Sequence, residues 1–115
     1  FDSIGEGELC YITKEGMLYP LSGSPLLLGL AQEIIKDEKF KSIKPSPYTA
    51  LTLDSLVARA RGFGTISIMA LTKDKIPKPW HWFDDTKDKV DMNKLYLASD
   101  FVWEMLKRLV QKTRF

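Results

Sequence analysis

Residues 65–71 read Thr-Ile-Ser-Ile-Met-Ala-Leu and carry the clearest strand signal in the chain. Their β-branched and other apolar side chains predict a strand in a central position of a sheet. The charged, proline-containing residues 73–79 that follow predict a turn. Residues 80–83 are then expected to return as a strand antiparallel to 65–71.

An N-terminal β-hairpin is predicted over residues 8–21. Residues 8–13 (Glu-Leu-Cys-Tyr-Ile-Thr) have the composition of a strand, and residues 17–21 are expected to form its partner. Gly16 lies between them and can adopt the positive φ that a short hairpin loop needs.

Two helices are predicted between this hairpin and residues 65–71. Ser24 and Pro25 form a typical helix start, and the helical spacing of apolar residues that follows extends to about Lys39. Residues 44–47 (Lys-Pro-Ser-Pro) are expected to be an extended loop, because a proline disfavours helical backbone in the residue before it. A second, shorter helix is expected after the N-cap Thr52.

The C-terminal segment allows two interpretations. It is either one helix from about Met92, or a strand at residues 94–98 followed by a helix capped by Ser99; we favour the second, because Leu95-Tyr96-Leu97 is typical of a strand. Both interpretations contain one apolar helical stripe. Its members are Phe101, Met105, Leu106, Leu109 and Val110.

These elements predict an α+β domain, with a small, mostly antiparallel sheet that includes the N-terminal hairpin and is covered by two or three helices. With 115 residues, 44% of them hydrophobic and 28% charged, the chain fits one domain over residues 1–115. This composition excludes disorder, collagen, coiled coil and disulfide-rich scaffolds. Because the chain begins with Phe1 rather than Met, we expect it to be excised from a larger protein.

Composition also bears on partners and location. No run of about 18 apolar residues exists, so no membrane contact is expected. The single cysteine, Cys10, has no partner for an internal disulfide, which favours a reducing, cytoplasmic location. A net charge of +2 is too small to argue by itself for binding to a polyanion.

Residues that could support catalysis are few. His81 is the only histidine, and with one distant cysteine it does not form a typical zinc site. A nucleophilic pair of Cys10 with His81 is possible, but a buried structural thiol is the commoner role for such a cysteine. Asp84 and Asp85 are more typical of a solvated turn than of an acid–base pair. We therefore expect no catalytic residues, no metal and no cofactor.

The aromatic residues offer more. Residues 80–83 (Trp-His-Trp-Phe) place four rings in four positions, of which at least one pair is expected to be core. Near the N-terminus, Phe1, Tyr11 and Tyr19 could face each other across about 7 Å and form a slot for a flat cation. The alternative is an ordinary hairpin with one tyrosine in the core and one on the surface.

This layout of an aromatic residue before a hairpin, a tyrosine on the hairpin, helices and then an apolar strand resembles the small cap-binding domain of bunyavirus L proteins, especially those of phenuiviruses. In that family a methylated guanine is clamped between two aromatic rings. The resemblance implies that Phe1 and Tyr19 are the two rings and that Leu71 is the apolar side chain lining the slot. Tyr11, Trp82 and Asp84 are weaker ligand-binding candidates.

The first functional hypothesis is therefore a non-catalytic module that binds capped RNA or an m7G nucleotide, within a larger viral polymerase that takes capped primers. The second is a protein-interaction or assembly domain that uses the last helix or Trp80–Phe83 as its contact surface, with a winged-helix-like variant in which residues 65–83 form the wing. The third, a small enzyme that uses Cys10, His81 or the Asp pair, has the least support.

Overall fold

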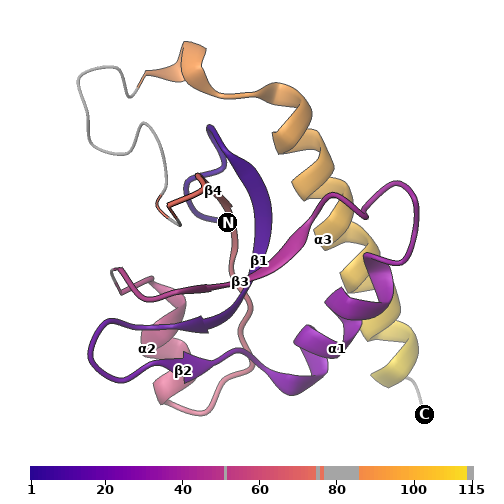
Figure 1. Ribbon diagram of the computed structural model, residues 1–115. Coiled ribbons are helices and arrows are strands. Elements are labelled where there is room, and N and C mark those ends of the chain that lie inside the picture. The colour runs from indigo at the N-terminus through magenta and orange to yellow at the C-terminus, as the bar shows by residue number, and fades with distance from the viewer. Residues whose placement is uncertain (51, 75, 77–85, 114–115) are drawn as a thin grey trace.

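The sheet is organised around strand β1 (Glu8–Glu15), which pairs with each of the other three strands (Figure 1). β2 (Leu21–Ser22) and β4 (Ile68–Leu71) pair with it antiparallel, and β3 (Lys44–Tyr48) pairs with it parallel. The fold is therefore α+β, as predicted, with a small mixed sheet. The computed structural model describes residues 1–50, 52–74, 76 and 86–113.

Strand β4 confirms the buried strand predicted at residues 65–71, although it is shorter. All four of its residues are buried. One edge of β4 pairs with β1, and the other edge is hydrogen-bonded to the N-terminal segment. There the Asp2 N–H donates to the Ile68 carbonyl at 3.0 Å, and the Ala70 N–H donates to the Ser3 carbonyl at 3.2 Å. The predicted return strand at residues 80–83 lies outside the described residues.

The predicted N-terminal hairpin is confirmed, because β2 pairs antiparallel with β1, but its second strand is Leu21–Ser22 rather than residues 17–21. Residues 16–20 form the connection after β1, and only the two residues of β2 pair with it. Met17, Leu18 and Tyr19 are all exposed, because the core does not extend to this tip. Gly16 does adopt the expected positive φ, at 116°.

Strand β3 was not predicted, although its residues were expected to be extended. Pro45 and Pro47 keep the backbone extended and lack the N–H that a sheet ladder uses. Such residues are tolerated on edge strands, and β3 is at the edge of the sheet, paired only with β1. Ser46 and Tyr48 point their side chains into the protein and are buried.

Helix α1 (Pro25–Ile34) begins where predicted and ends five residues before the expected Lys39. The chain then turns back and buries Phe40 and Ile43. A continuous helix would not place both side chains in the core. Helix α2 (Ser55–Ala60) follows Asp54 rather than Thr52, and a short 3-10 turn, η1 (Lys87–Lys89), precedes the last helix.

Helix α3 (Met92–Thr113) is one helix of 22 residues, so the favoured strand at residues 94–98 is wrong. Asp91, rather than Ser99, caps it: its carboxylate accepts hydrogen bonds from the backbone N–H of Asn93 at 3.0 Å and of Lys94 at 3.4 Å. Ala98 is buried one turn before Phe101, so the apolar period of the helix already includes residues assigned to the strand.

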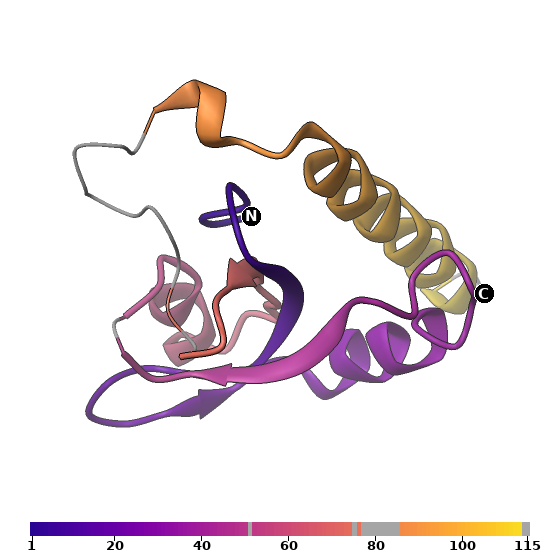
Figure 2. The same cartoon turned by 45° about the horizontal axis from the view of Figure 1, so that its top comes forward.

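Both faces of the sheet are covered. On one face, Leu9 and Tyr11 of β1 pack against the buried side chains of α1 and α3, which lie side by side (Figure 2). On the other face, Cys10 and Ile12 pack with a second cluster that includes Leu71. This alternation along β1 is the two-residue period of a strand buried on both sides.

Candidate functional site

The three residues expected to hold a methylated guanine lie in different environments. Phe1 is 66% exposed at the N-terminus, next to the residue that bonds to Ile68 of β4. Tyr19 is 85% exposed at the tip between β1 and β2. Leu71 is only 2% exposed and belongs to the core cluster on the second face of the sheet.

The structure does not bring these residues to one slot. Leu71 pairs with Glu8, the first residue of β1, while Tyr19 lies beyond Glu15, the last. At about 3.3 Å per residue, β1 extends over roughly 23 Å, whereas a ring clamp needs about 7 Å between its sides. Tyr19 and Leu71 therefore lie at opposite ends of the central strand.

Of the weaker ligand-binding candidates, Tyr11, Trp82 and Asp84, the structure describes only Tyr11. Tyr11 is buried and stacks on Phe101, with ring centroids 6.5 Å apart and planes inclined by 22°. This ring is part of the core that joins the sheet to α3, so it is not open to a ligand. Trp82 and Asp84 lie outside the described residues, as does the whole Trp80–Phe83 segment.

The residues of the enzymatic hypothesis are also only partly described. Cys10 is buried in the second core cluster, and its thiol donates to the Glu8 carbonyl at 3.5 Å. His81 and Asp85 lie outside the described residues. Within residues 1–50, 52–74, 76 and 86–113, no group of three His, Cys, Asp or Glu side chains is placed to hold a metal ion.

One buried polar cluster was not anticipated. The Ser55 hydroxyl lies 2.6 and 2.7 Å from the two carboxylate oxygens of Glu15, and 2.7 Å from the Ser67 hydroxyl. Glu15 ends β1, Ser55 begins α2, and Ser67 directly precedes β4. The cluster joins three elements and is structural, since its hydroxyls already hydrogen-bond to the carboxylate. Ser55 and Ser67 follow Glu15 in the chain by 40 and 52 positions, and no sequence motif links residues so far apart.

A depression of about 400 Å³ lies between the start of β1 and the first turns of α3. Its charged residues, Glu8, Lys44 and Lys94, are of both signs. Lys44 donates to the Lys41 carbonyl at 3.0 Å, and Lys94 lies 3.6 Å from Asp91. Such a mixed and locally paired set does not favour a particular ligand.

The outer face of α3 is the most extensive exposed apolar feature of a described helix. We call its exposed hydrophobic residues the outer stripe; they are Met92, Tyr96, Trp103, Leu106 and Val110. Trp103 is 63% exposed, and a groove of about 280 Å³ runs between Trp103, Leu106 and Val110. The single apolar stripe expected on this helix is therefore wrong: Phe101 and Met105 face the core, while Leu106 and Val110 belong to the outer stripe.

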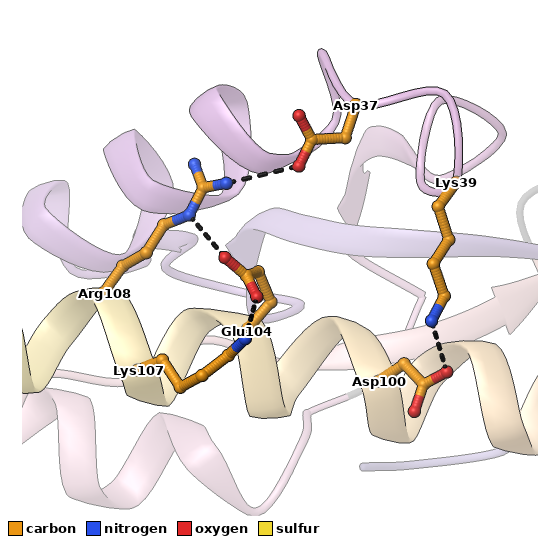
Figure 3. Close-up of polar contacts among 6 residues, drawn as sticks. All are labelled: Asp37, Lys39, Asp100, Glu104, Lys107 and Arg108. Carbon is orange, nitrogen blue, oxygen red and sulfur yellow. Dashed lines mark hydrogen bonds and ion pairs between the residues drawn. The ribbon is translucent and has the colours of Figure 1, made fainter.

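Ion pairs hold α3 against the rest of the domain (Figure 3). Arg108 donates to Glu104 at 2.9 Å and to Asp37, just beyond α1, at 3.2 Å. Lys39 pairs with Asp100 at 2.8 Å. Hydrogen bonds from Lys107 and Arg108 hold the pKa of Glu104 below its ordinary value. These contacts, with the buried side chains, fix which face of α3 points outward.

No helix within the described residues is long and apolar enough to cross a membrane. No family model matches the chain, and neither a curated protein nor a solved structure matches it significantly. These comparisons do not bear on the resemblance to the cap-binding domain, which stays a prediction.

Proposed function

We propose that this domain is a protein-interaction module that binds another α-helix on the outer stripe of α3. The single observation that carries the proposal is the row of exposed hydrophobic side chains around Trp103. Scattered apolar residues are normal on a protein surface, but a contiguous apolar row marks a contact site. Tryptophan is also among the residues that dominate binding energy at protein interfaces.

The spacing of the outer stripe favours a helical partner. Trp103, Leu106 and Val110 are separated by three and four residues, which is the spacing of a coiled-coil seam. Side chains at this spacing leave gaps into which the side chains of a second helix fit. The groove between these three residues is such a gap.

The outer stripe is held ready for a partner. Phe101 and Met105 are buried on the inner face of α3, and the pairs of Arg108 and Asp100 flank the same helix. A contact surface on a rigid helix loses little conformational entropy on binding. Binding therefore requires no rearrangement of α3.

The test uses a defined helical probe. The stripe peptide is a fluorescent peptide of residues 92–113 in which the core-facing Ala98, Phe101, Met105 and Leu109 are each replaced by Gln, so that its exposed-face residues dominate its apolar surface. We expect saturable binding to the domain by fluorescence anisotropy. Trp103→Glu in the domain should remove binding, because a charge would be buried at the centre of the contact.

Asn93→Glu is the matched control, because it adds the same charge to an exposed residue of the same helix that does not line the groove around Trp103. It should leave the affinity for the stripe peptide nearly unchanged. The proposal fails if the peptide does not bind, or if binding survives Trp103→Glu.

A further inference from the structure

We infer that the helix bound by the outer stripe is α3 of a second copy of this chain, packed antiparallel to the first. This inference rests on the proposed function of the outer stripe and names its partner. It depends on three properties of α3: the repeat of the exposed positions, the sizes of their side chains and the charges beside them.

The repeat extends over the whole helix. With Ser99 and Thr113 added, the positions of the outer stripe follow one another at alternating steps of four and three residues. They are Met92, Tyr96, Ser99, Trp103, Leu106, Val110 and Thr113. A repeat averaging 3.5 residues keeps one helix face in register with a partner that has the same repeat. The same α3 of a second copy satisfies this condition.

Side-chain size selects the antiparallel orientation. The symmetry axis of the antiparallel pair lies between Trp103 and Leu106, so Trp103 is opposite Leu106 of the second copy. Ser99 is then opposite its Val110, and Tyr96 is opposite its Thr113. Each large residue then meets a smaller one, so the layers fill evenly. A parallel arrangement would place Trp103 against Trp103 and Ser99 against Ser99, which overfills one layer and leaves a gap in the other.

Charge selects the same orientation. Asp100 and Lys107 each come one residue after a position of the repeat, Ser99 and Leu106, so they flank the same side of the outer stripe. Their side chains are 51% and 50% exposed. In the antiparallel pair, Asp100 lies beside Lys107 of the second copy, and the contact occurs twice by symmetry. In a parallel pair, Asp100 and Lys107 would instead each face the opposite flank of the second copy's outer stripe. That flank is apolar: Leu95, Val102 and Leu109.

Both charged groups already have a partner within the chain and retain capacity for another. Asp100 pairs with Lys39 at 2.8 Å, and Lys107 pairs with Glu104 at 2.6 Å. A carboxylate accepts several hydrogen bonds and an ammonium donates three, so a contact across the interface does not require the existing one to break.

The described part of the fold leaves room for the second copy. In Figure 2, α1 and the sheet lie on one side of α3, and no described element covers the other side. The paired segment, residues 96–113, is about 26 Å long at 1.5 Å per residue. A single helix pair is a small interface, so the dimer should be weak and depend on concentration.

The first experiment measures the mass of the intact 13.2 kDa chain by sedimentation equilibrium. We expect the mass to rise towards that of a dimer with concentration. Trp103→Glu should weaken the dimer by a factor of roughly 30 or more, the loss typical of a central hot-spot tryptophan. Asn93→Glu, which lies before the paired segment, should leave it unchanged.

The second experiment tests the orientation by disulfide formation under mild oxidation. A Ser99→Cys chain mixed with a Val110→Cys chain should form a mixed disulfide dimer. Ser99→Cys alone should not crosslink, because the two Ser99 positions lie about 16 Å apart along an antiparallel pair, whereas a disulfide needs Cα atoms within about 7 Å.

The outcomes separate the two proposals. A chain that stays monomeric while it binds the stripe peptide overturns the inferred second copy and leaves the proposed function standing. A dimer in which Ser99→Cys crosslinks to itself overturns the antiparallel arrangement. A dimer that Trp103→Glu does not weaken overturns the inferred α3 interface, and failure of peptide binding overturns the proposed function.

Discussion

At the scale of single residues, the buried Glu15 shows how distant parts of the chain meet. A buried carboxylate is costly unless it is hydrogen-bonded. Ser55 and Ser67 supply hydroxyl groups to this carboxylate, so Glu15 couples the end of β1 to α2 and to the residue before β4. Neither serine is recognisable in the sequence as part of this cluster.

Ser55→Ala should destabilise the domain by about 1–3 kcal/mol, because among the described residues it leaves the Glu15 carboxylate with only the 3.4 Å contact to Ser67. Urea denaturation measures this loss. Ser42→Ala is the control, since Ser42 is exposed and its removal should change the stability by less than about 0.5 kcal/mol. Equal stability of the two variants would contradict the assigned role of the cluster.

The buried tyrosines predict a loss of stability in alkali. Burial raises the pKa of Tyr11 and of Tyr48 above the ordinary value of 10.0, and the charge of Asp2 contributes for Tyr48. The folded chain therefore keeps these protons at a pH where the unfolded chain has released them. The free energy of unfolding should be unaffected by these groups below pH 10 and should fall as the pH rises above it. Tyr11→Phe should make the free energy of unfolding fall less steeply with pH above 10. An unchanged slope would contradict the contribution of Tyr11.

The exposed Tyr19 provides the test of the cap-binding interpretation. That interpretation predicts that m7GTP raises the melting temperature of the domain, that GTP does not, and that Tyr19→Ala removes the shift. Tyr19 is exposed enough to stack on a base, but Leu71 lies at the other end of β1. An equal response to both nucleotides, or no response, would remove the interpretation.

At the scale of elements, two glycines illustrate opposite constraints. Gly7 leads into β1 with φ at 105°, and a Cβ built there would lie 2.6 Å from the Leu71 carbonyl oxygen. Gly29 lies within α1, and nothing lies within 4 Å of the position of its Cβ. The first glycine is needed for the close approach to β4, and the second is not required by packing.

Gly7→Ala and Gly29→Ala should therefore change stability in opposite directions. Gly7→Ala should destabilise the domain by more than about 1 kcal/mol, through strain and the clash with backbone. Gly29→Ala should stabilise it by about 0.5–1 kcal/mol, because alanine is the better helix former. Thermal melts of the two variants measure both effects, and a shift of the same sign in both would contradict the assignment.

In the last helix, the local sequence preference of one segment differs from its structure. Leu95-Tyr96-Leu97 is typical of a strand when taken alone, yet it lies inside α3. Leu95 and Leu97 are partly buried against the core that contains Ala98, Phe101 and Met105, so they continue its helical period, while Tyr96 points outward. Packing against α1 and the sheet outweighed the local preference, because burial of a helix face contributes more than intrinsic propensity.

At the scale of the whole molecule, α3 carries two apolar faces with different roles. Phe101 is completely buried and packs on Tyr11 and Phe40, whereas Leu106 points outward. Phe101→Ala should cost about 3–5 kcal/mol of stability. Leu106→Ala should cost less than about 0.5 kcal/mol in the monomer. Denaturation of both variants at low protein concentration, where the chain is monomeric, measures the two losses. Comparable losses would mean that Leu106 belongs to the core.

The sequence by itself determined the fold class, the first strand, the buried strand before residue 72 and the start of α1. These depend on side-chain alternation, apolar runs and a proline at the first helical position, all of which act within a few residues. Only the tertiary structure decided that Lys44–Tyr48 joins the sheet, that α3 is continuous, and that Phe101 and Trp103 point to opposite environments. It also placed Tyr19 and Leu71 at opposite ends of β1. The physical reason is that strand pairing and burial depend on which distant segments come into contact, and a local pattern of apolar residues does not specify its partner.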